Sequence, residues 1–144
     1  MELSVVSLGG DRHRITIGRH ELIVDQPRDA GGEDAGPTPV DLFVASLASC
    51  VSHYARRGLG ADGGRPEVHC RWTMSETPPW RVAAIAMNVT LPAGTSDRRV
   101  DAVRRAIAHC TVHNSILQSP MLTITTRAAV PRALDEPVGL GAPA

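Results

Sequence analysis

The sequence is poor in aromatic side chains, has no excess of either charge and contains no long hydrophobic run. With one Phe and one Tyr, its core must be built from Val, Ile, Leu and Ala. The 15 basic residues, all arginine, balance 15 acidic residues without forming a basic block, which argues against binding to nucleic acid or to a membrane surface. The charge-free run 42–54 is too short to span a bilayer.

Cysteine is scarce as well. Three cysteines, an odd number, do not suggest the disulfide framework of a secreted protein. The first residues lack the basic and apolar segments of a secretory signal, so we expect a cytoplasmic protein with chemically useful thiols. The length predicts one domain over residues 1–130, followed by a loose Pro-, Gly- and Ala-rich tail over 131–144.

An apolar stretch between Thr38 and Gly58 has the start and stop signals of a helix. Thr38 suits the N-cap, Pro39 the first helical position and Asp41 the acid of a capping box. Gly58 can adopt the left-handed conformation that ends a helix. Because small and apolar residues occur on every side, we expect this helix to be buried on all sides. In so small a domain, such burial favours a dimer with a shared core.

The sequence predicts short strands and two further helices in the rest of the chain. Alternation of residues predicts strands at 3–8, 14–18, 21–25, 67–74, 81–91 and 121–127. Apolar spacing predicts helices at 97–109 and 111–117, with Thr111 as the cap of the second. The loop 26–36 is long enough to be functional or mobile. This order predicts an α+β fold with antiparallel sheets around a central helix.

Two of the three thiols stand out by position. Cys50 lies in the middle of the long helix and Cys110 at a junction between helices, both facing apolar surroundings. Each alone is consistent with an ordinary core residue. A thiol reacts as the thiolate, so it needs a cation, a helix N-terminus or hydrogen bonds to lower a pKa of roughly 8.5. Cys50 therefore needs an arginine from elsewhere. Cys70, beside Trp72 on the apolar face of a strand, is expected to be a core residue.

A metal site is the rival interpretation. The ligands available to it are Cys50, His53, His109, Cys110 and His113. Cys50 and His53, three residues apart, can share a helix face. We nevertheless expect His109 and His113 to be surface histidines near a helix terminus, and we expect no metal.

Two segments resemble the signatures of one family. Residues 36–50, Gly-Pro-Thr-Pro-Val-Asp-Leu-Phe-Val-Ala-Ser-Leu-Ala-Ser-Cys, resemble the helix of the OsmC/Ohr family, the osmotically induced and organic hydroperoxide resistance proteins. Residues 110–117, Cys-Thr-Val-His-Asn-Ser-Ile-Leu, resemble its second signature, a Cys-Pro-Val followed by a basic or polar residue and Leu. The resemblance covers about residues 12–127.

This resemblance implies an intertwined homodimer with two sites at its interface. In the active peroxidases, the helix cysteine attacks an organic hydroperoxide, the second cysteine forms a disulfide with it, and a dithiol reductant restores the pair. Carried over, Cys50 is the peroxidatic residue and Cys110 the resolving one. The activating arginine belongs to the N-terminal strand-turn, where Arg12 is the closest match and Arg14 and Arg19 are substitutes. No organic cofactor is implied.

The sequence departs from the family pattern at three places. Val40 stands where the peroxidase branch carries Glu, and Asp41 matches the Glu of another branch, so Asp41 is either a site residue or a capping residue. Arg12 aligns only through a gap, and Thr111 replaces the usual Pro. The alternative function is therefore a dimer of the same fold without peroxidase activity, which binds a small apolar or thiol-reactive ligand at its interface.

Overall fold

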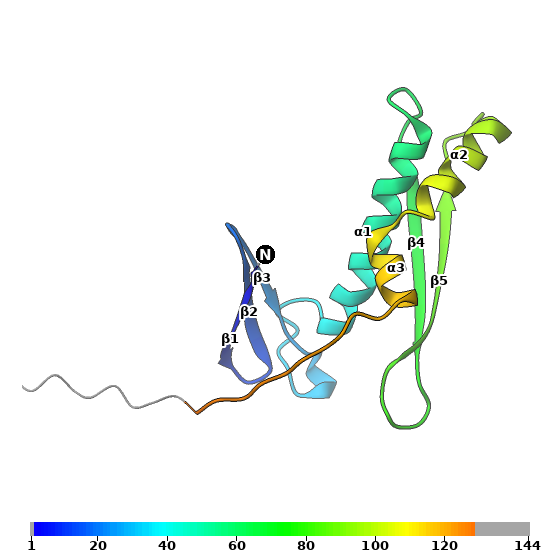
Figure 1. Ribbon diagram of the computed structural model, residues 1–144. Helices are drawn as coiled ribbons and strands as arrows, with labels where there is room; N and C mark the ends of the chain where they lie inside the picture. The colour runs from blue at the N-terminus through cyan, green and yellow to red at the C-terminus, as the bar shows by residue number, and fades with distance from the viewer. Residues whose placement is uncertain (1, 129–144) are drawn as a thin grey trace, which may run out of the picture.

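The computed structural model describes residues 2–128, and it confirms the α+β fold with antiparallel sheets (Figure 1). The elements in chain order are β1 (Ser4–Gly9), β2 (Arg12–Ile17), β3 (His20–Val24), the 3-10 turn η1 (Arg28–Ala30), α1 (Pro39–Leu59), β4 (Glu67–Met74), β5 (Val82–Thr90), α2 (Asp97–Ile107) and α3 (Thr111–Leu117). Across this part of the chain, no helix has the length and apolar character needed to cross a membrane. The predicted tail over 131–144 lies outside the described residues.

Strands β1, β2 and β3 form an antiparallel meander at the N-terminus. Val5 pairs with Ile15, and Ile15 pairs with Leu22, so these three side chains share one face of the sheet. This face is apolar, yet Val5 is 55% exposed and Leu22 41% exposed. Figure 1 shows the sheet standing apart from the helices. Within residues 2–128, the sheet therefore has no covering layer from its own chain.

The start of α1 follows the predicted pattern. The backbone N–H and the hydroxyl of Thr38 each donate to Oδ2 of Asp41 at 2.8 Å, and the Asp41 N–H donates back to Thr38 Oγ1 at 3.1 Å. Pro39 occupies the first turn. The capping box is confirmed, and it satisfies backbone donors that have no partner within the helix.

The predicted end of α1 at Gly58 is wrong, because the helix continues to Leu59 and Gly60 takes the positive φ of 78° at its C-cap. Gly58 has a different role. A Cβ atom at Gly58 would lie 2.6 Å from Cα of Val103 on α2 and 3.0 Å from the carbonyl oxygen of Ala102. Glycine is needed there because the backbones of α1 and α2 approach closely.

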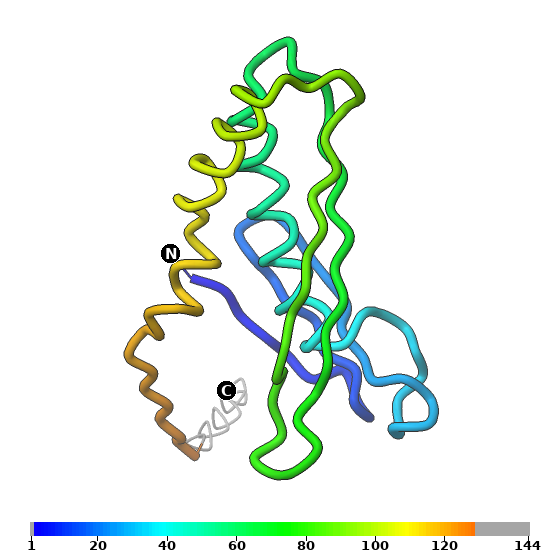
Figure 2. Tube along the Cα trace, turned by 90° about the vertical axis from the view of Figure 1, so that its right-hand side faces the viewer, coloured from blue at the N-terminus to red at the C-terminus, as the bar shows by residue number. Residues whose placement is uncertain are grey.

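Within one chain, helix α1 is buried along one stripe. The stripe consists of Val44, Leu47, Val51, Ala55 and Leu59. The hairpin β4–β5 and the segment α2–α3 pack against α1 (Figure 2). Phe43, however, is 43% exposed, and Ser49 and His53 are exposed as well. The described part of one chain supplies too few elements to surround the helix.

Strands β4 and β5 pair antiparallel from Glu67 opposite Thr90 to Met74 opposite Val82. Their inner side chains pack on the middle of α1: Val68, Ile85, Met87 and Val89. Helix α2 ends at Ile107, two residues before the predicted end. Cys110, not Thr111, occupies the N-cap position of α3, so Thr111 is the first helical residue.

The strand predicted over 121–127 is not formed. The residues after α3 continue as irregular chain, in which Met121 is 95% and Ile124 79% exposed. A segment with alternating side chains forms a strand only where a neighbouring strand supplies backbone hydrogen bonds. The described part of this chain offers that segment no such neighbour.

The loop between β3 and α1 is organised around one carboxylate. Asp25 is 1% exposed and accepts hydrogen bonds from the backbone N–H groups of Gln26 at 2.8 Å, Glu33 at 3.0 Å and Ala35 at 3.1 Å. The bond from Ala35 lowers the pKa of Asp25 most, burial opposes it, and the other two bonds and the charge of Arg12 lower it further. These bonds tie both ends of the loop to one buried side chain.

Replacing Asp25 by Asn should lower the melting temperature at neutral pH, because an amide cannot accept all three backbone hydrogen bonds as a carboxylate does. Since folding lowers the pKa of Asp25, its stabilisation is present above the unfolded value of about 3.8 and is lost as pH falls through the folded value. The difference between the wild type and Asp25→Asn should therefore shrink in acid. A difference that stays constant between pH 7 and pH 3 would contradict this assignment.

Replacing Gly58 by Ala should lower the free energy of unfolding by about 1–3 kcal/mol, because overpacking against α2 outweighs the helix propensity of alanine. Denaturant unfolding measures this change. The control is Ser49→Ala on the exposed side of α1, which should change stability by less than about 0.5 kcal/mol. Equal stability of the two variants would contradict this prediction, because it would show that α2 moves to accommodate the added methyl group.

Candidate functional site

The structure brings Cys50 and Cys110 together as free thiols. Cys110 is fully buried and packs with Leu47 and Val51, and Cys50 lies against the same cluster. Leu47 and Cys50 are three residues apart on α1 and so share a helix face. The connection from α2 to α3 places the second thiol beside that face. Cys70 is half-buried on β4 and is not part of the cluster.

The two thiols have opposite pKa shifts. Burial raises the pKa of Cys50, but the hydrogen bond from the Cys110 thiol and the backbone N–H groups of Val112 and Thr111 outweigh it and lower the pKa. Burial raises the pKa of Cys110, and its bond to Cys50 raises it further, while the backbone N–H groups of His113 and Val112 offset part of the rise. Cys50 is therefore the thiol that ionises first.

Arg12 and Asp41 lie in other environments. Nη1 of Arg12 forms an ion pair with Oε2 of Glu33 at 2.9 Å, at the N-terminal sheet. Within residues 2–128, no guanidinium is among the groups that shift the pKa of Cys50. The carboxylate of Asp41 is engaged in the capping box with Thr38. The site of a single chain thus contains two thiols and backbone N–H groups.

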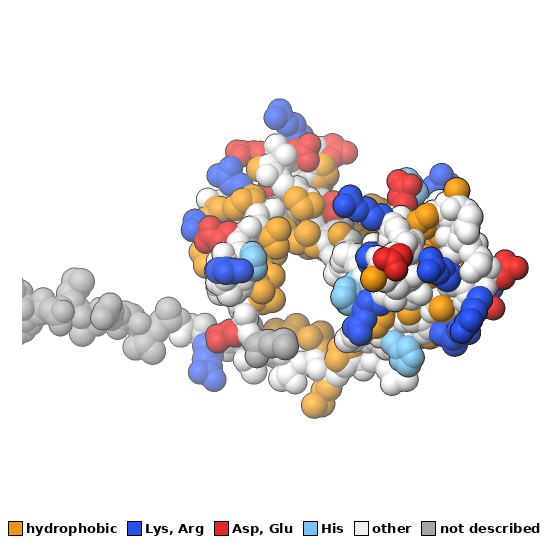
Figure 3. Space-filling model, turned by 90° about the horizontal axis from the view of Figure 1, so that it is seen from above, with side chains coloured by type: hydrophobic (Ala, Val, Ile, Leu, Met, Phe, Trp, Pro, Cys, Tyr) orange, Lys and Arg blue, Asp and Glu red, His pale blue; other side chains and the backbone are white. Residues whose placement is uncertain are grey.

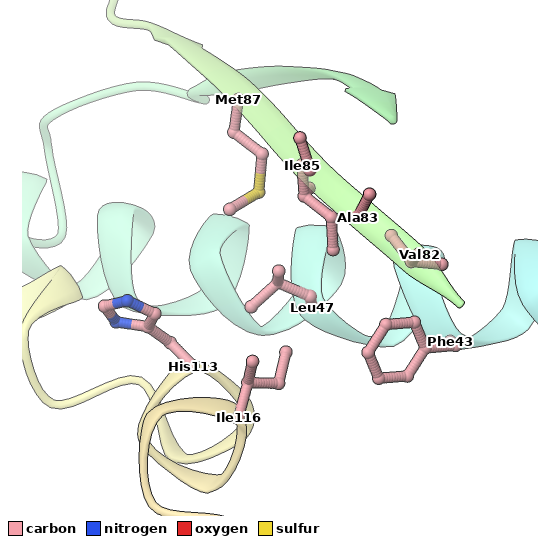
Figure 4. A pocket seen from close by; sticks show the side chains of 9 residues that line it. Phe43, Leu47, Val82, Ala83, Ile85, Met87, His113 and Ile116 are labelled. Carbon is pink, nitrogen blue, oxygen red and sulfur yellow. The ribbon is translucent and has the colours of Figure 1, made fainter. Parts of the chain in front are cut away.

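An apolar groove of about 310 Å³ lies beside the thiol pair, between α1, β5 and α3 (Figure 4). Its lining residues are Phe43, Leu47, Val82, Ala83, Ala84, Ile85, Met87, His113 and Ile116. Leu47 lines the groove and also packs against Cys110, and Met87 likewise belongs to both. The inner end of the groove is therefore formed by the same side chains that surround the thiols. Its volume is at the lower end of the ~300–1,000 Å³ usual for small-molecule sites.

His113 was missed by the sequence reasoning, which placed it on the surface. It is half-buried and lines the groove, and its Nδ1 is buried without a hydrogen-bond partner among the described residues. The signal for this placement is helical spacing. His113 and Ile116 are three residues apart and face the same side of α3.

The rival metal site is not assembled in the part of the chain that the structure describes. No three side chains of His, Cys, Asp or Glu gather there in a way that could hold a metal ion. His53 is exposed and makes an edge-to-face contact with Tyr54, with ring centroids 5.3 Å apart. The residues proposed as ligands from sequence are thus divided between different surroundings.

Comparison with known proteins agrees with this fold. Residues 31–125 match the family model described as OsmC-like protein. An osmotic stress and detoxification response protein from Psychrobacter arcticus shares 24% identity at a TM-score of 0.69, over 78% of this chain and 85% of that one. An OsmC-like protein from Mycoplasma pneumoniae shares 15% identity at a TM-score of 0.68, over 82% and 87%.

A third solved structure, the organic hydroperoxide resistance protein OsmC from Legionella pneumophila, shares 19% identity at a TM-score of 0.62, over 80% of this chain and 87% of that one. At these identities, the likeness to solved structures establishes the fold. No curated protein sequence matches the chain. The match of the family model covers most of the chain, and on that ground the protein belongs to the OsmC-like family.

Proposed function

We propose that this protein is a cytoplasmic thiol peroxidase that reduces organic hydroperoxides in defence against oxidative stress. The observation that carries the proposal is the meeting of two free thiols with opposite pKa shifts beside an apolar groove. Membership of the OsmC-like family supports it. Structural neighbours from Legionella pneumophila and Elizabethkingia anophelis are named organic hydroperoxide resistance proteins, which also supports it.

The reaction has three steps. The Cys50 thiolate attacks the terminal oxygen of the hydroperoxide, so an S–O bond forms, the O–O bond breaks and the alkoxide takes up a proton to leave as an alcohol. The Cys110 thiol then attacks the Cys50 sulfenic acid, and a disulfide forms as water leaves. A dithiol reductant reduces this disulfide by exchange and becomes a disulfide itself.

The opposite pKa shifts suit these separate roles. The thiol with the lowered pKa supplies the thiolate that the first step needs. The thiol with the raised pKa keeps its proton until the sulfenic acid forms. Because Cys110 is already in contact with Cys50, resolution does not wait for a distant thiol. Rapid resolution protects Cys50 from irreversible oxidation to the sulfinic acid.

We further propose that the active form is a homodimer. The N-terminal sheet exposes the apolar side chains Leu3, Val5, Ile17 and Leu22, and α1 exposes Phe43. Figure 3 shows hydrophobic side chains around the hollow between the N-terminal sheet and the helices. Exposed apolar surface of this extent marks an interaction site. A second copy that inserts its own α1 and sheet would cover both surfaces at once and would close the site.

In such a dimer, Arg12 would act on the partner's Cys50. The N-terminal sheet stands apart from α1 of its own chain, and Arg12 does not contribute to the pKa of its own Cys50. An arginine beside Cys50 would stabilise the thiolate further. The ion pair with Glu33 holds the Arg12 side chain in place while 38% of it remains exposed.

The second candidate function is a dimeric binding protein without peroxidase activity. The absence of a guanidinium near Cys50 within the described part of one chain favours it, as does the apolar lining of the groove. Such a protein would hold a small apolar or thiol-reactive ligand at the dimer interface. Slow alkylation of both thiols, together with no peroxide turnover, would identify this function.

The protein with cumene hydroperoxide and dithiothreitol should consume peroxide, and Cys50→Ser should reduce consumption to the rate without protein. Cys110→Ser should still be oxidised once and should accumulate a sulfenic acid that dimedone traps, because the resolving thiol is missing. The matched control is Cys70→Ser, which should retain wild-type turnover. Wild-type protein that consumes no peroxide with any dithiol would contradict the proposed function.

Two inactive variants should restore activity when their subunits are mixed. An Arg12→Ala chain retains Cys50, and a Cys50→Ser chain retains Arg12. If Arg12 serves the partner's Cys50, a mixed dimer contains one complete site, so turnover should reach about half of the wild-type value per mixed dimer. If both residues must come from one chain, the mixture stays inactive, and that outcome would contradict the shared site.

A further inference from the structure

Among the described residues, the groove is lined by one polar side chain, His113, and one nitrogen of its ring is buried without a hydrogen-bond partner. Apart from His113, the described residues that line the groove are apolar. Nδ1 of His113 is buried and finds no hydrogen-bond partner within residues 2–128. Leaving a buried nitrogen unpaired costs free energy, and a polar group of a bound ligand would offset that cost.

His113 is attached directly to the backbone that contacts the thiols. Its own backbone N–H lowers the pKa of Cys110, and the N–H of the preceding residue, Val112, lowers the pKa of Cys50. Figure 4 shows the imidazole on the groove side of α3, near Leu47 and Met87. Leu47 lies one helical turn before Cys50, and it lines the groove together with His113.

The first step of the proposed reaction needs a proton at this position. When the O–O bond breaks, the electron pair goes to the oxygen that carries the alkyl group, and an alkoxide is a poor leaving group unless it is protonated. The other lining residues cannot supply a proton, because their side chains are hydrocarbon or thioether. The imidazole of His113 is able to do so.

We propose that His113 is the proton donor to the departing alkoxide, an inference that rests on the proposed peroxidase function. The Cys50 sulfur bonds to the terminal oxygen of the hydroperoxide, and the O–O bond breaks. The alkyl-bearing oxygen takes the electron pair and a proton from the ring of His113, and the alcohol leaves. The ring regains a proton from solvent before the next cycle, and the reduced Cys50 thiol releases its own proton to solvent, so protons balance over the cycle.

His113→Gln tests this role at neutral pH. Glutamine keeps hydrogen-bonding atoms, but its side chain does not donate a proton to a leaving group. Single-turnover oxidation of Cys50 by tert-butyl hydroperoxide should slow by about 100-fold, the lower range of general acid catalysis. Oxidation by peracetic acid should change only a few-fold, because acetate leaves without protonation. Alkylation of Cys50 by iodoacetamide needs the thiolate and no proton donor, so its rate should not change.

The matched control is His109→Gln, which removes an exposed histidine at the end of α2 and should behave as the wild type with all three reagents. His113→Leu replaces the imidazole by hydrocarbon and should show the same selective loss with tert-butyl hydroperoxide. Agreement between the two variants makes the conclusion independent of how the glutamine side chain packs. An equal loss with all three reagents would assign His113 to packing and overturn the proposal.

The outcome also separates this inference from the function on which it rests. Wild-type protein that reacts with tert-butyl hydroperoxide, beside a His113→Gln variant of equal rate, would overturn the role of His113 and leave the peroxidase intact. Wild-type protein that is alkylated at Cys50 but is not oxidised by either peroxide would overturn both.

Discussion

The contact between the α2–α3 connection and the middle of α1 is the constraint on which the site depends. Cys110 fills a fully buried position against Leu47 and Val51, and in doing so it lies beside Cys50. The same connection delivers the backbone N–H groups of Thr111 and Val112 to the Cys50 sulfur. Packing and thiol chemistry are thus set by one piece of chain, since a shift of α3 would remove the core contact and the hydrogen bonds together.

The position of that connection follows from how closely the two helices pack. Gly58 allows the backbone of α2 to lie against α1 near Val103, which fixes where α2 begins its path along the longer helix. From there α2 runs beside α1 (Figure 1), and Cys110, three residues after its end, packs against Leu47 and Val51 in the middle of the longer helix. The glycine has no part in the chemistry, yet the placement of the second thiol rests on the approach it permits.

Much of this arrangement was predictable from local signals. The capping box of Thr38 and Asp41 acts within one turn of chain, and the β4–β5 hairpin follows from alternation, so both could be predicted from sequence. The position of Cys50 and Cys110 on apolar faces was predictable for the same reason. Their contact was expected from a family resemblance, because spacing along a chain carries no information about which distant faces meet.

The features that were predicted wrongly depend on neighbours in space. Glycine is a common signal for the end of a helix, which is why Gly58 was expected to end α1. Inside the helix, glycine is needed at this position because the backbone of α2 lies too close for a side chain. The strand expected over 121–127 has the right alternation and no adjacent edge in the described chain. His113 was placed on the surface because histidine is polar. The short α3 nevertheless turns it towards the groove together with Ile116.

The bare apolar face of the N-terminal sheet links folding to association. No element among residues 2–128 covers this face, and an exposed apolar face gains hydrophobic free energy only when another surface covers it. A molecule that binds this face stabilises the folded state by mass action. The melting temperature of the protein would therefore depend on the concentration of that molecule. The stability of this sheet is thus a property of the protein together with its binding partner, rather than of the isolated polypeptide.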